Sequence, residues 1–133
     1  MSCVFCEIVA GRLPASLVAR EPAATAFLDA RPLFKGHVLV VPNAHVETLP
    51  ELPDLQPMFG LAQRISAALP KALGAQGSFV AVNNVVSQSV PHLHVHVVPR
   101  TKGDGLKGFF WPRTKYASDE ERDEVARKIA AAI

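Results

Sequence analysis

The sequence predicts an α+β fold in which a mainly antiparallel, five-stranded sheet packs with one long central helix, followed by a C-terminal helix. Three observations lead to this prediction. Short Val-, Leu- and Phe-rich runs, bounded by proline or glycine, have the length and composition of strands. One longer stretch repeats its apolar residues with the period of an amphipathic helix. A capping signature near the C-terminus indicates a second helix.

Five short apolar segments have the character of strands. A turn at Glu21-Pro22 joins the first two segments, and the third begins after Gly36 and stays apolar up to Pro42. An uninterrupted Val/Leu run of this kind is typical of a strand that is covered on both faces. We therefore expect strands at residues 17–20, 25–29, 37–41, 79–83 and 92–98, paired mainly in antiparallel fashion.

Two helices are predicted in the rest of the chain. From residue 54 to residue 74, apolar residues recur every three or four positions. Pro57 fits the first turn of this central helix, whereas Pro70 is expected to disturb its last turn. Ser118 and Glu121 form a capping box before a segment with a narrow apolar side, which predicts a peripheral C-terminal helix.

The chain has 133 residues, and we expect residues 1–133 to form one domain. Its 14 Lys and Arg residues against 12 Asp and Glu residues give a formal net charge of +2, and the basic residues are scattered. This pattern argues against duplex nucleic acid as the main partner. No apolar run is long enough to cross a membrane and no leader peptide is recognisable, so a cytoplasmic protein is expected.

Three histidines occupy alternate positions in the last predicted strand: His92, His94 and His96. Because alternate side chains of a strand point to one face, the three imidazoles should project together while Val and Leu pack on the other face. The chain has only five histidines. Their concentration here indicates a site for metal ligation, proton transfer or nucleophilic attack near neutral pH.

A catalytic metal held by these histidines is one alternative. A dinuclear hydrolase would need carboxylate ligands as well. The acidic residues nearest in the sequence are Asp104 after the motif and Glu51 and Asp54 well before it. Their distance along the chain argues against a catalytic metal at the three histidines.

Cys3 and Cys6 form a Cys-x-x-Cys pair near the N-terminus. The two residues are too close in sequence to close a large loop, and a reducing compartment would keep them as thiols. Taken alone, the pair is open to three interpretations: a redox pair, one half of a zinc site, or two incidental thiols. A zinc site would need two further ligands.

The pattern of these residues resembles the histidine triad (HIT) family of nucleotide hydrolases and transferases. The signature of that family is His-φ-His-φ-His-φ-φ, where φ is apolar, and residues 92–98 match it at every position. The resemblance extends along most of the chain, through residues 3–9, 26–29, 35–42 and 88–91. It implies the HIT fold, which is an α+β fold.

The resemblance implies a set of catalytic residues. His94, the middle histidine, would attack the α-phosphorus of a nucleotide and form a covalent nucleotidyl-histidine intermediate. A backbone carbonyl near His94 should hold one ring nitrogen as N–H and leave the other bare. His96 and His37 would donate hydrogen bonds to the phosphoryl oxygens, and Ser89 would help to protonate the leaving group.

The resemblance also implies a set of substrate-binding residues. Asp29 would accept hydrogen bonds from the ribose hydroxyls, Gln88 would line the phosphate and the leaving group, and Asn83 would be a site residue at the end of its strand. Without the resemblance, an ordinary strand-start histidine is the favoured interpretation of His37, a turn residue at a strand end is as good an interpretation of Asp29 as a ligand residue, and Asn83 is open to interpretation as a turn residue. The base would lie in an apolar slot whose residues are otherwise typical core residues: Phe5, Ile8, Phe27 and Leu39.

The resemblance completes the zinc site as well. In HIT proteins with this cysteine pair, a histidine after the third strand and the first triad histidine supply the remaining ligands, here His45 and His92. Two thiolates and two imidazoles, from Cys3, Cys6, His45 and His92, would satisfy a closed tetrahedral Zn²⁺ with a structural role. No organic cofactor is expected.

The implied activity is cleavage at the α-phosphate of a nucleoside phosphoramidate or a dinucleoside polyphosphate, with release of a nucleoside monophosphate. The nucleotide is most often an adenosine nucleotide in this family, and members commonly pair as homodimers that extend one sheet across both subunits. Two alternatives stay open. One is a nucleotide-binding sensor or interaction module with little turnover, and the other is a zinc-dependent hydrolase that uses the triad as ligands.

Two segments differ from relatives in ways that bear on function. Many relatives have a longer, glycine-containing connection before the triad, whereas this chain has Asn84–Ser87. Because glycines let backbone amides approach phosphate, the phosphate cradle of this chain is not predicted in detail. The segment Gly108–Tyr116 concentrates aromatic and basic residues, which could stack on a second base, bind a polyphosphate or form a subunit interface.

Overall fold

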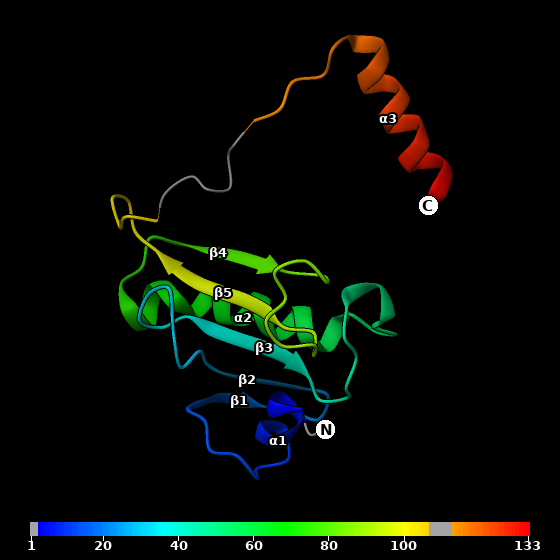
Figure 1. The fold of residues 1–133 in the computed structure, drawn as a ribbon. Coiled ribbons are helices and arrows are strands. Elements are labelled where there is room, and N and C mark those ends of the chain that lie inside the picture. The colour runs from blue at the N-terminus through cyan, green and yellow to red at the C-terminus, as the bar shows by residue number, and fades with distance from the viewer. Residues whose placement is uncertain (1–2, 107–112) are drawn as a thin grey trace.

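A computed structural model describes residues 3–106 and 113–133 of the chain. Within these residues five strands form one antiparallel sheet in the order β1-β2-β3-β5-β4 (Figure 1). The predicted five-stranded antiparallel sheet is thereby confirmed. The strands are β1 Leu17–Arg20, β2 Ala24–Leu28, β3 Val38–Pro42, β4 Gly77–Val82 and β5 Val95–Arg100.

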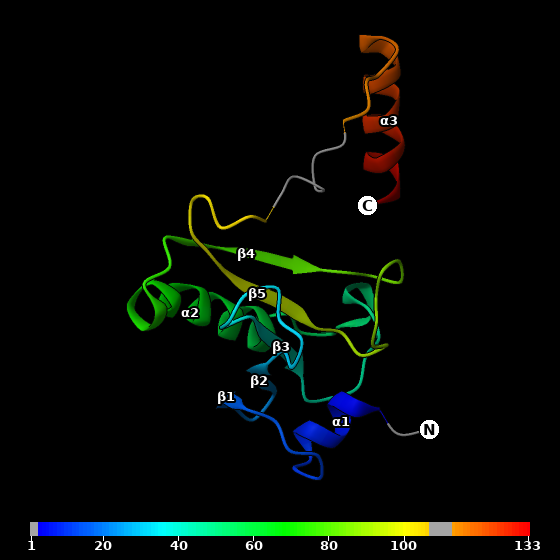
Figure 2. The same cartoon turned by 60° about the vertical axis from the view of Figure 1, so that its left-hand side comes forward.

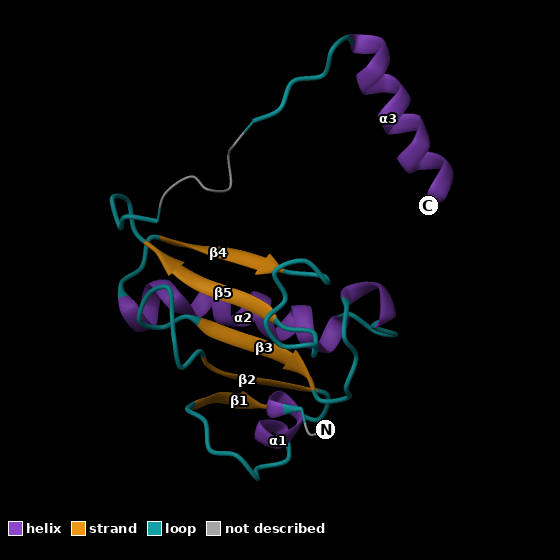
Figure 3. Cartoon of the chain, in the orientation of Figure 1, coloured by secondary structure: helices purple, strands orange, loops and turns teal. Residues whose placement is uncertain are grey.

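Helices in the described ranges accompany the sheet (Figure 3). They are α1 Val4–Val9, α2 Gln56–Leu73 and α3 Asp119–Ala132, together with a short 3-10 turn at Leu49–Glu51. The long central helix and the C-terminal helix are confirmed, whereas the sequence patterns did not predict α1 or the 3-10 turn. Of the aromatic and basic segment noted in the sequence, residues 108–112 lie outside the described residues.

The sheet separates two apolar clusters, with α2 on one face and α1 on the other (Figure 2). Side chains alternate along β3, so that Val38 and Val40 pack on the α2 side, which also contains Leu61 and Ile65 of α2. The predicted two-sided burial of this strand is confirmed. The cluster on the α1 side consists of Phe5, Ile8, Phe27, Leu39 and Val41.

Pro70 does not end α2, although it was expected to disturb the last turn. The helix continues to Leu73 and closes at Gly74, whose φ of 71° is the left-handed conformation that a helix C-terminus commonly requires. The N–H of Gly74 donates to the carbonyl of Pro70 at 3.0 Å. This C-terminal cap satisfies a carbonyl that would otherwise lack an intrahelical partner.

β5 begins at Val95, three residues later than the predicted start at His92. The pairing register explains the delay. Val95 lies opposite Val40 of β3, and continuing this register would set Leu93 opposite Pro42, which has no N–H to donate. The N–H of Leu93 instead donates to the carbonyl of Val46 at 2.8 Å. The first two triad histidines therefore lie in the segment that leads into the strand.

α3 lies apart from the sheet and its two clusters (Figure 1), and its described residues are not buried. The predicted capping box is present, because the N–H of Glu121 donates to Oγ of Ser118 at 3.1 Å. The carboxylate of Glu121 reaches back to the N–H of Ala117 at 2.8 Å. Over the part of the chain that the structure describes, no helix has the length and apolar character needed to cross a membrane.

The turn before β3 generates a stability prediction. Gly36 has a φ of +97°, and a Cβ at this position would lie 2.4 Å from Cδ1 of Leu73. Gly36→Ala should lower the free energy of unfolding by at least about 1 kcal/mol, because it combines left-handed strain with a steric contact. The matched control is Gly77→Ala, where a Cβ would meet open space. Equal urea midpoints for the two variants would contradict this assignment.

Candidate functional site

A cavity of about 840 Å³ opens on the α1 side of the sheet, within the size range of small-molecule sites. Its walls come from α1 and the loop after it, from the end of β2, and from β3 and β5. Eight of the predicted site residues line it: Phe5, Ile8, Phe27, Asp29, Leu39, Ser89, His94 and His96. The cavity therefore combines an apolar slot with a short row of polar groups.

Three of the predicted catalytic and substrate-binding residues lie outside the cavity lining in the described chain. His37 is buried, at 3% exposure, behind His96. The side-chain amide of Asn83 donates to the carbonyl of Ser87 at 3.4 Å. The side-chain amide of Gln88 donates to the carbonyl of Glu47 and accepts from the N–H of Val85. Asn83 and Gln88 therefore hold the connection between β4 and the triad.

The connection between β4 and the triad is a strained turn. Val85 and Ser87 have φ values of 67° and 63°, in the left-handed region that favours glycine. A β-branched residue such as valine is rarely found there, so surrounding contacts must hold the turn in this conformation. The amide of Gln88 supplies one of them through its bond to the N–H of Val85 at 2.9 Å. Non-glycine residues thus adopt a backbone conformation that glycine adopts more readily.

The cavity also includes residues that the sequence patterns did not single out. Residues 13–16, in the loop after α1, form part of its wall. Arg31 contributes the sole Lys or Arg among the described lining residues. The backbone N–H of Arg31 donates to Oδ1 of Asp29 at 2.9 Å. The position of Arg31, two residues after the predicted ligand residue Asp29, could have indicated that it lines the site. Residues 13–16 include no residue type that indicates a binding or catalytic role.

His94 presents one ring nitrogen to the cavity. Its Nδ1 lies 2.7 Å from the carbonyl oxygen of His92, and because a carbonyl can only accept, Nδ1 carries the hydrogen. This is the backbone carbonyl that was expected beside His94. Among the described residues, every side-chain nitrogen or oxygen that is buried from solvent has a hydrogen-bond partner. Nε2 of His94 has no hydrogen-bond partner among these residues, so it must be accessible to solvent. The ring packs edge-on against Phe5, with centroids 5.1 Å apart.

His96 and His37 form a hydrogen-bonded pair of rings near His94. Nε2 of His37 lies 2.9 Å from Nδ1 of His96, and Nδ1 of His37 accepts from the N–H of Leu33 at 3.1 Å. Burial lowers the pKa of His37. Burial, with smaller contributions from His94 and His37, lowers the pKa of His96 to about 4. Both rings are therefore neutral at pH 7.

A carboxylate lies close to the triad, contrary to the interpretation drawn from distance along the sequence. Oδ2 of Asp29 is 3.8 Å from Nε2 of His37. Asp29, His37 and His96 consequently have ligand atoms within 4.8 Å of one another, as in a metal site. The carboxylate comes from the end of β2, which pairs with β3, and this pairing is what brings it beside the histidine at the start of β3.

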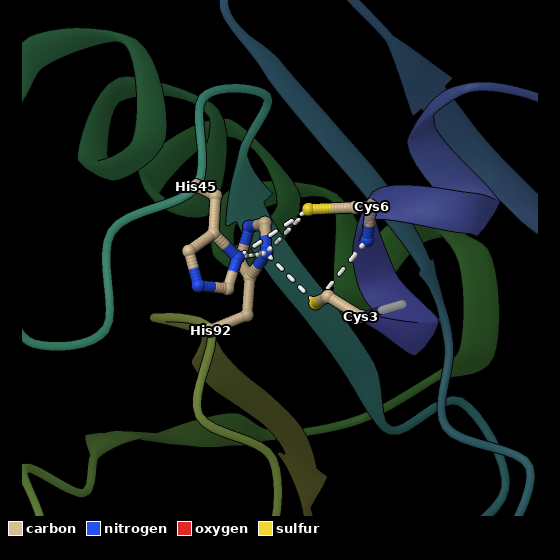
Figure 4. A group of neighbouring side chains, drawn as sticks. All are labelled: Cys3, Cys6, His45 and His92. Carbon is tan, nitrogen blue, oxygen red and sulfur yellow. Dashed lines mark hydrogen bonds between the residues drawn. The ribbon is translucent and has the colours of Figure 1, made fainter. Parts of the chain in front are cut away.

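The four predicted zinc ligands also meet (Figure 4). Sγ of Cys3 lies 3.3 Å from Nδ1 of His92, and Sγ of Cys6 lies 3.4 Å from Nδ1 of His45. The two Nδ1 atoms are 3.1 Å apart. A tetrahedral zinc with ordinary Zn–S and Zn–N bonds would place its ligand atoms about 3.3–3.8 Å apart. The four side chains fit a metal of this kind.

Local structure prepares the two sides of this cluster. Cys3 caps α1 and Cys6 lies one turn further, so both thiols share one side of the helix. Nε2 of His92 donates to the carbonyl of Pro42 at 2.9 Å, which leaves Nδ1 bare and directed at the thiols. Burial lowers the pKa of His92 and raises the pKa of the Cys6 thiol. A bare imidazole nitrogen is the form that binds a metal.

The arrangement defines an α+β protein whose cavity is lined by two histidines, His94 and His96. The HIT domain family matches residues 10–103, more than half of the chain. The chain belongs to the HIT family.

Sequence relatives and solved structures match nearly the whole chain. An adenosine 5′-monophosphoramidase of Schizosaccharomyces pombe is 33% identical over 136 residues, which cover 97% of this chain and 99% of the relative. A HIT family protein of Bacillus subtilis matches the structure with a TM-score of 0.88 at 31% identity, covering 100% of this chain and 98% of the other. A zinc-bound histidine triad family protein of Mycobacterium smegmatis has a TM-score of 0.76 at 36% identity, and each chain is 98% covered.

The neutral histidines generate a prediction about acid stability. The pKa of His96 is about 4 in the folded protein against an ordinary 6.5, so below pH 6.5 the unfolded chain binds a proton that the folded chain does not. Stability should therefore fall as the pH drops from about 6.5 towards 4. In thermal melts of metal-free protein, the loss of Tm between pH 7 and pH 5 should be smaller for His96→Gln than for the native protein. Equal losses of Tm in the native protein and in His96→Gln would contradict the prediction.

Proposed function

We propose that the chain is a nucleotide hydrolase or transferase that cleaves at the α-phosphate of a nucleoside phosphoramidate or a dinucleoside polyphosphate, through a covalent nucleotidyl-His94 intermediate. One observation carries this proposal. The hydrogen bond from Nδ1 of His94 to the carbonyl of His92 leaves Nε2 bare and accessible beside an apolar slot. A bare, neutral imidazole nitrogen is a nucleophile at physiological pH.

The reaction proceeds in two displacements. In the first, Nε2 of His94 forms a bond to the α-phosphorus while the bond from phosphorus to the leaving group breaks. Ser89, on the cavity wall, passes a proton to the departing amine or phosphate. In the second, water attacks the phosphorus and releases His94. The hydroxyl of the water stays on the nucleoside monophosphate, and its proton replaces the one that Ser89 passed on.

The remaining lining residues position the nucleotide. His96 donates to a non-bridging phosphoryl oxygen, where negative charge develops in the transition state. Asp29 accepts hydrogen bonds from the ribose hydroxyls, because the backbone N–H of Arg31 occupies one acceptor site on Oδ1 and leaves the others of the carboxylate for a ligand. The base enters the slot between α1 and the sheet, where Phe5 and Phe27 pack edge-on with centroids 5.3 Å apart. An adenosine nucleotide is the proposed substrate class, and the adenosine 5′-monophosphoramidase relative supports it.

We propose that Cys3, Cys6, His45 and His92 hold a structural Zn²⁺. The close approach of the four ligand atoms and the zinc-bound relative support this assignment. The metal would fasten α1 to the segment that carries His94 and would take no part in the displacement. A zinc hydrolase with all three triad histidines as ligands is the less favoured alternative, because among the described residues the ligand atom of His92 gathers with those of Cys3, Cys6 and His45 and not with His94 and His96.

The proposed assembly is a homodimer, and the proposed location is the cytoplasm. β4 is an edge strand of the sheet, and Val80 within it is 45% exposed. An unpaired edge of this kind can pair with the same edge of a second copy, which would extend one sheet across two subunits.

The nucleophile is tested by His94→Ala. This variant should lose at least about 1,000-fold in kcat on adenosine 5′-phosphoramidate and on a diadenosine polyphosphate, since the proposed covalent intermediate forms on the ring that it removes. Acid-quenched single turnovers of the native protein should yield an adenylyl adduct on the peptide that contains His94. A protein that only binds nucleotides would saturate without an adduct. Turnover by the variant at the native rate would refute the mechanism.

The zinc assignment is tested by a double substitution, Cys3→Ser with Cys6→Ser. The native protein should contain one zinc per chain by metal analysis. The double variant should contain none and should lose several degrees of Tm, because metal-binding free energy contributes to folding. Its kcat should change less than that of His94→Ala. Native protein purified without chelators and found free of zinc would remove the assignment.

A further inference from the structure

We infer that His37 is a positioning residue, which fixes the tautomer of His96 through a hydrogen-bond relay that begins at the backbone N–H of Leu33. In this arrangement His37 does not touch the substrate. The inference rests on the proposed function only in the role of His96 as a donor to phosphoryl oxygen. The state of the two rings follows from the hydrogen bonds alone.

The first step of the relay assigns the hydrogen of His37. Nδ1 of His37 lies 3.1 Å from the backbone nitrogen of Leu33. A backbone N–H can only donate, so Nδ1 of His37 must accept and cannot carry a hydrogen. Burial lowers the pKa of His37, which keeps the ring neutral. The single hydrogen of the neutral ring is therefore on Nε2.

The second step assigns the hydrogen of His96. Nε2–H of His37 points at Nδ1 of His96, 2.9 Å away. Nδ1 of His96 accepts this bond, so the hydrogen of the neutral His96 ring is on Nε2. Among the described residues Nε2 of His96 has no partner, and it is not sealed from solvent. His96 lines the cavity, so this N–H is the donor that it offers to a ligand.

The relay matters because His96 could otherwise adopt either tautomer. With the hydrogen on Nδ1, the ring would turn a lone pair towards the phosphoryl oxygen and would repel the charge that develops there. An aimed N–H donor acts on the transition state and is commonly worth about 100-fold to 1,000-fold in kcat. Fixing the tautomer in advance removes the need to reorganise the ring during the reaction.

The turn before β3 places the origin of the relay. The N–H of His37 donates to the carbonyl of Phe34 at 3.0 Å, which closes a tight turn and brings the N–H of Leu33 back to the His37 ring. Gly36 provides the left-handed conformation that this turn needs. His37 is 3% exposed and is not among the cavity residues, so it reaches a ligand only through His96.

The same relay explains why Asp29, His37 and His96 should not hold a metal despite their spacing. A metal on Nε2 of the neutral His37 ring would move the hydrogen to Nδ1, against the N–H of Leu33. At the cluster of thiols the backbone acts in the opposite sense, because the carbonyl of Pro42 holds the hydrogen of His92 on Nε2 and leaves Nδ1 bare. The backbone hydrogen bonds therefore favour metal binding at the cluster of Cys3, Cys6, His45 and His92 and disfavour it at Asp29, His37 and His96.

Nitrogen-15 spectra of histidine-labelled protein test the relay without any substrate. In the native protein His37 and His96 should both show Nε2–H and a bare Nδ1. The test variants are His37→Leu, which removes the donor, and His37→Gln, whose amide nitrogen can replace Nε2 as a donor to His96. His96 should become a mixture of tautomers in His37→Leu and should keep Nε2–H in His37→Gln. A native His96 ring with its hydrogen on Nδ1 would overturn the inference.

Steady-state kinetics on adenosine 5′-phosphoramidate form the second arm. His37→Leu should lower kcat by about 10-fold to 100-fold with KM changed by less than about threefold, and His37→Gln should recover most of the loss. An unchanged kcat in a folded His37→Leu variant would also overturn the positioning role. If that variant does not fold, the native spectrum and His37→Gln decide the question. Activity retained by His94→Ala would refute the proposed function but would leave the tautomer assignment standing.

Titration with zinc alone tests the corollary. The first equivalent added to metal-free protein should shift the ring signals of His45 and His92. Further zinc should leave the signals of His37 and His96 in place. A specific shift of the His37 and His96 signals at a second equivalent would contradict the relay, because it would require a bare Nε2 on His37.

Discussion

The chemistry of this site depends on backbone groups whose hydrogen-bonding character cannot change. The carbonyl of His92 can only accept, so His94 keeps its hydrogen on Nδ1 and presents Nε2 to the cavity. The carbonyl of Pro42 imposes the opposite assignment on His92, whose bare Nδ1 faces two thiols. One short segment thus carries two imidazoles in opposite tautomers, of which one is the proposed nucleophile and the other a proposed zinc ligand.

α1 connects these two regions. The thiols of Cys3, which caps the helix, and of Cys6 meet His45 and His92, while Phe5 and Ile8 line the cavity. The ring of Phe5 packs edge-on against His94 as well as against the sheet. A six-residue helix has too few internal hydrogen bonds to be stable alone. A metal bound by the two thiols would therefore help to fix the position of α1, which forms one wall of the cavity.

Local patterns predicted most elements, and the resemblance to the HIT family supplied the residues of the slot. β1 has its predicted bounds, and α2 ends where its apolar period ends. β5 starts late because the register would set Leu93 opposite Pro42, and a register is invisible until strands are paired. Likewise, Asp29 beside His37, and Gln88 bonded across 41 residues to the Glu47 carbonyl, depend on contacts between distant segments that no local pattern encodes.

The alternation of side chains along β3 separates two kinds of evolutionary change. Val38 and Val40 face α2 in the larger cluster, and Leu39 is the β3 residue that lines the cavity on the opposite face. Exchanges at Val38 and Val40 change the packing against α2 and therefore the stability of the fold, whereas exchanges at Leu39 reshape one wall of the cavity. Substitutions at Leu39 can therefore change which ligands fit the cavity, while the packing of Val38 and Val40 against α2 stays the same.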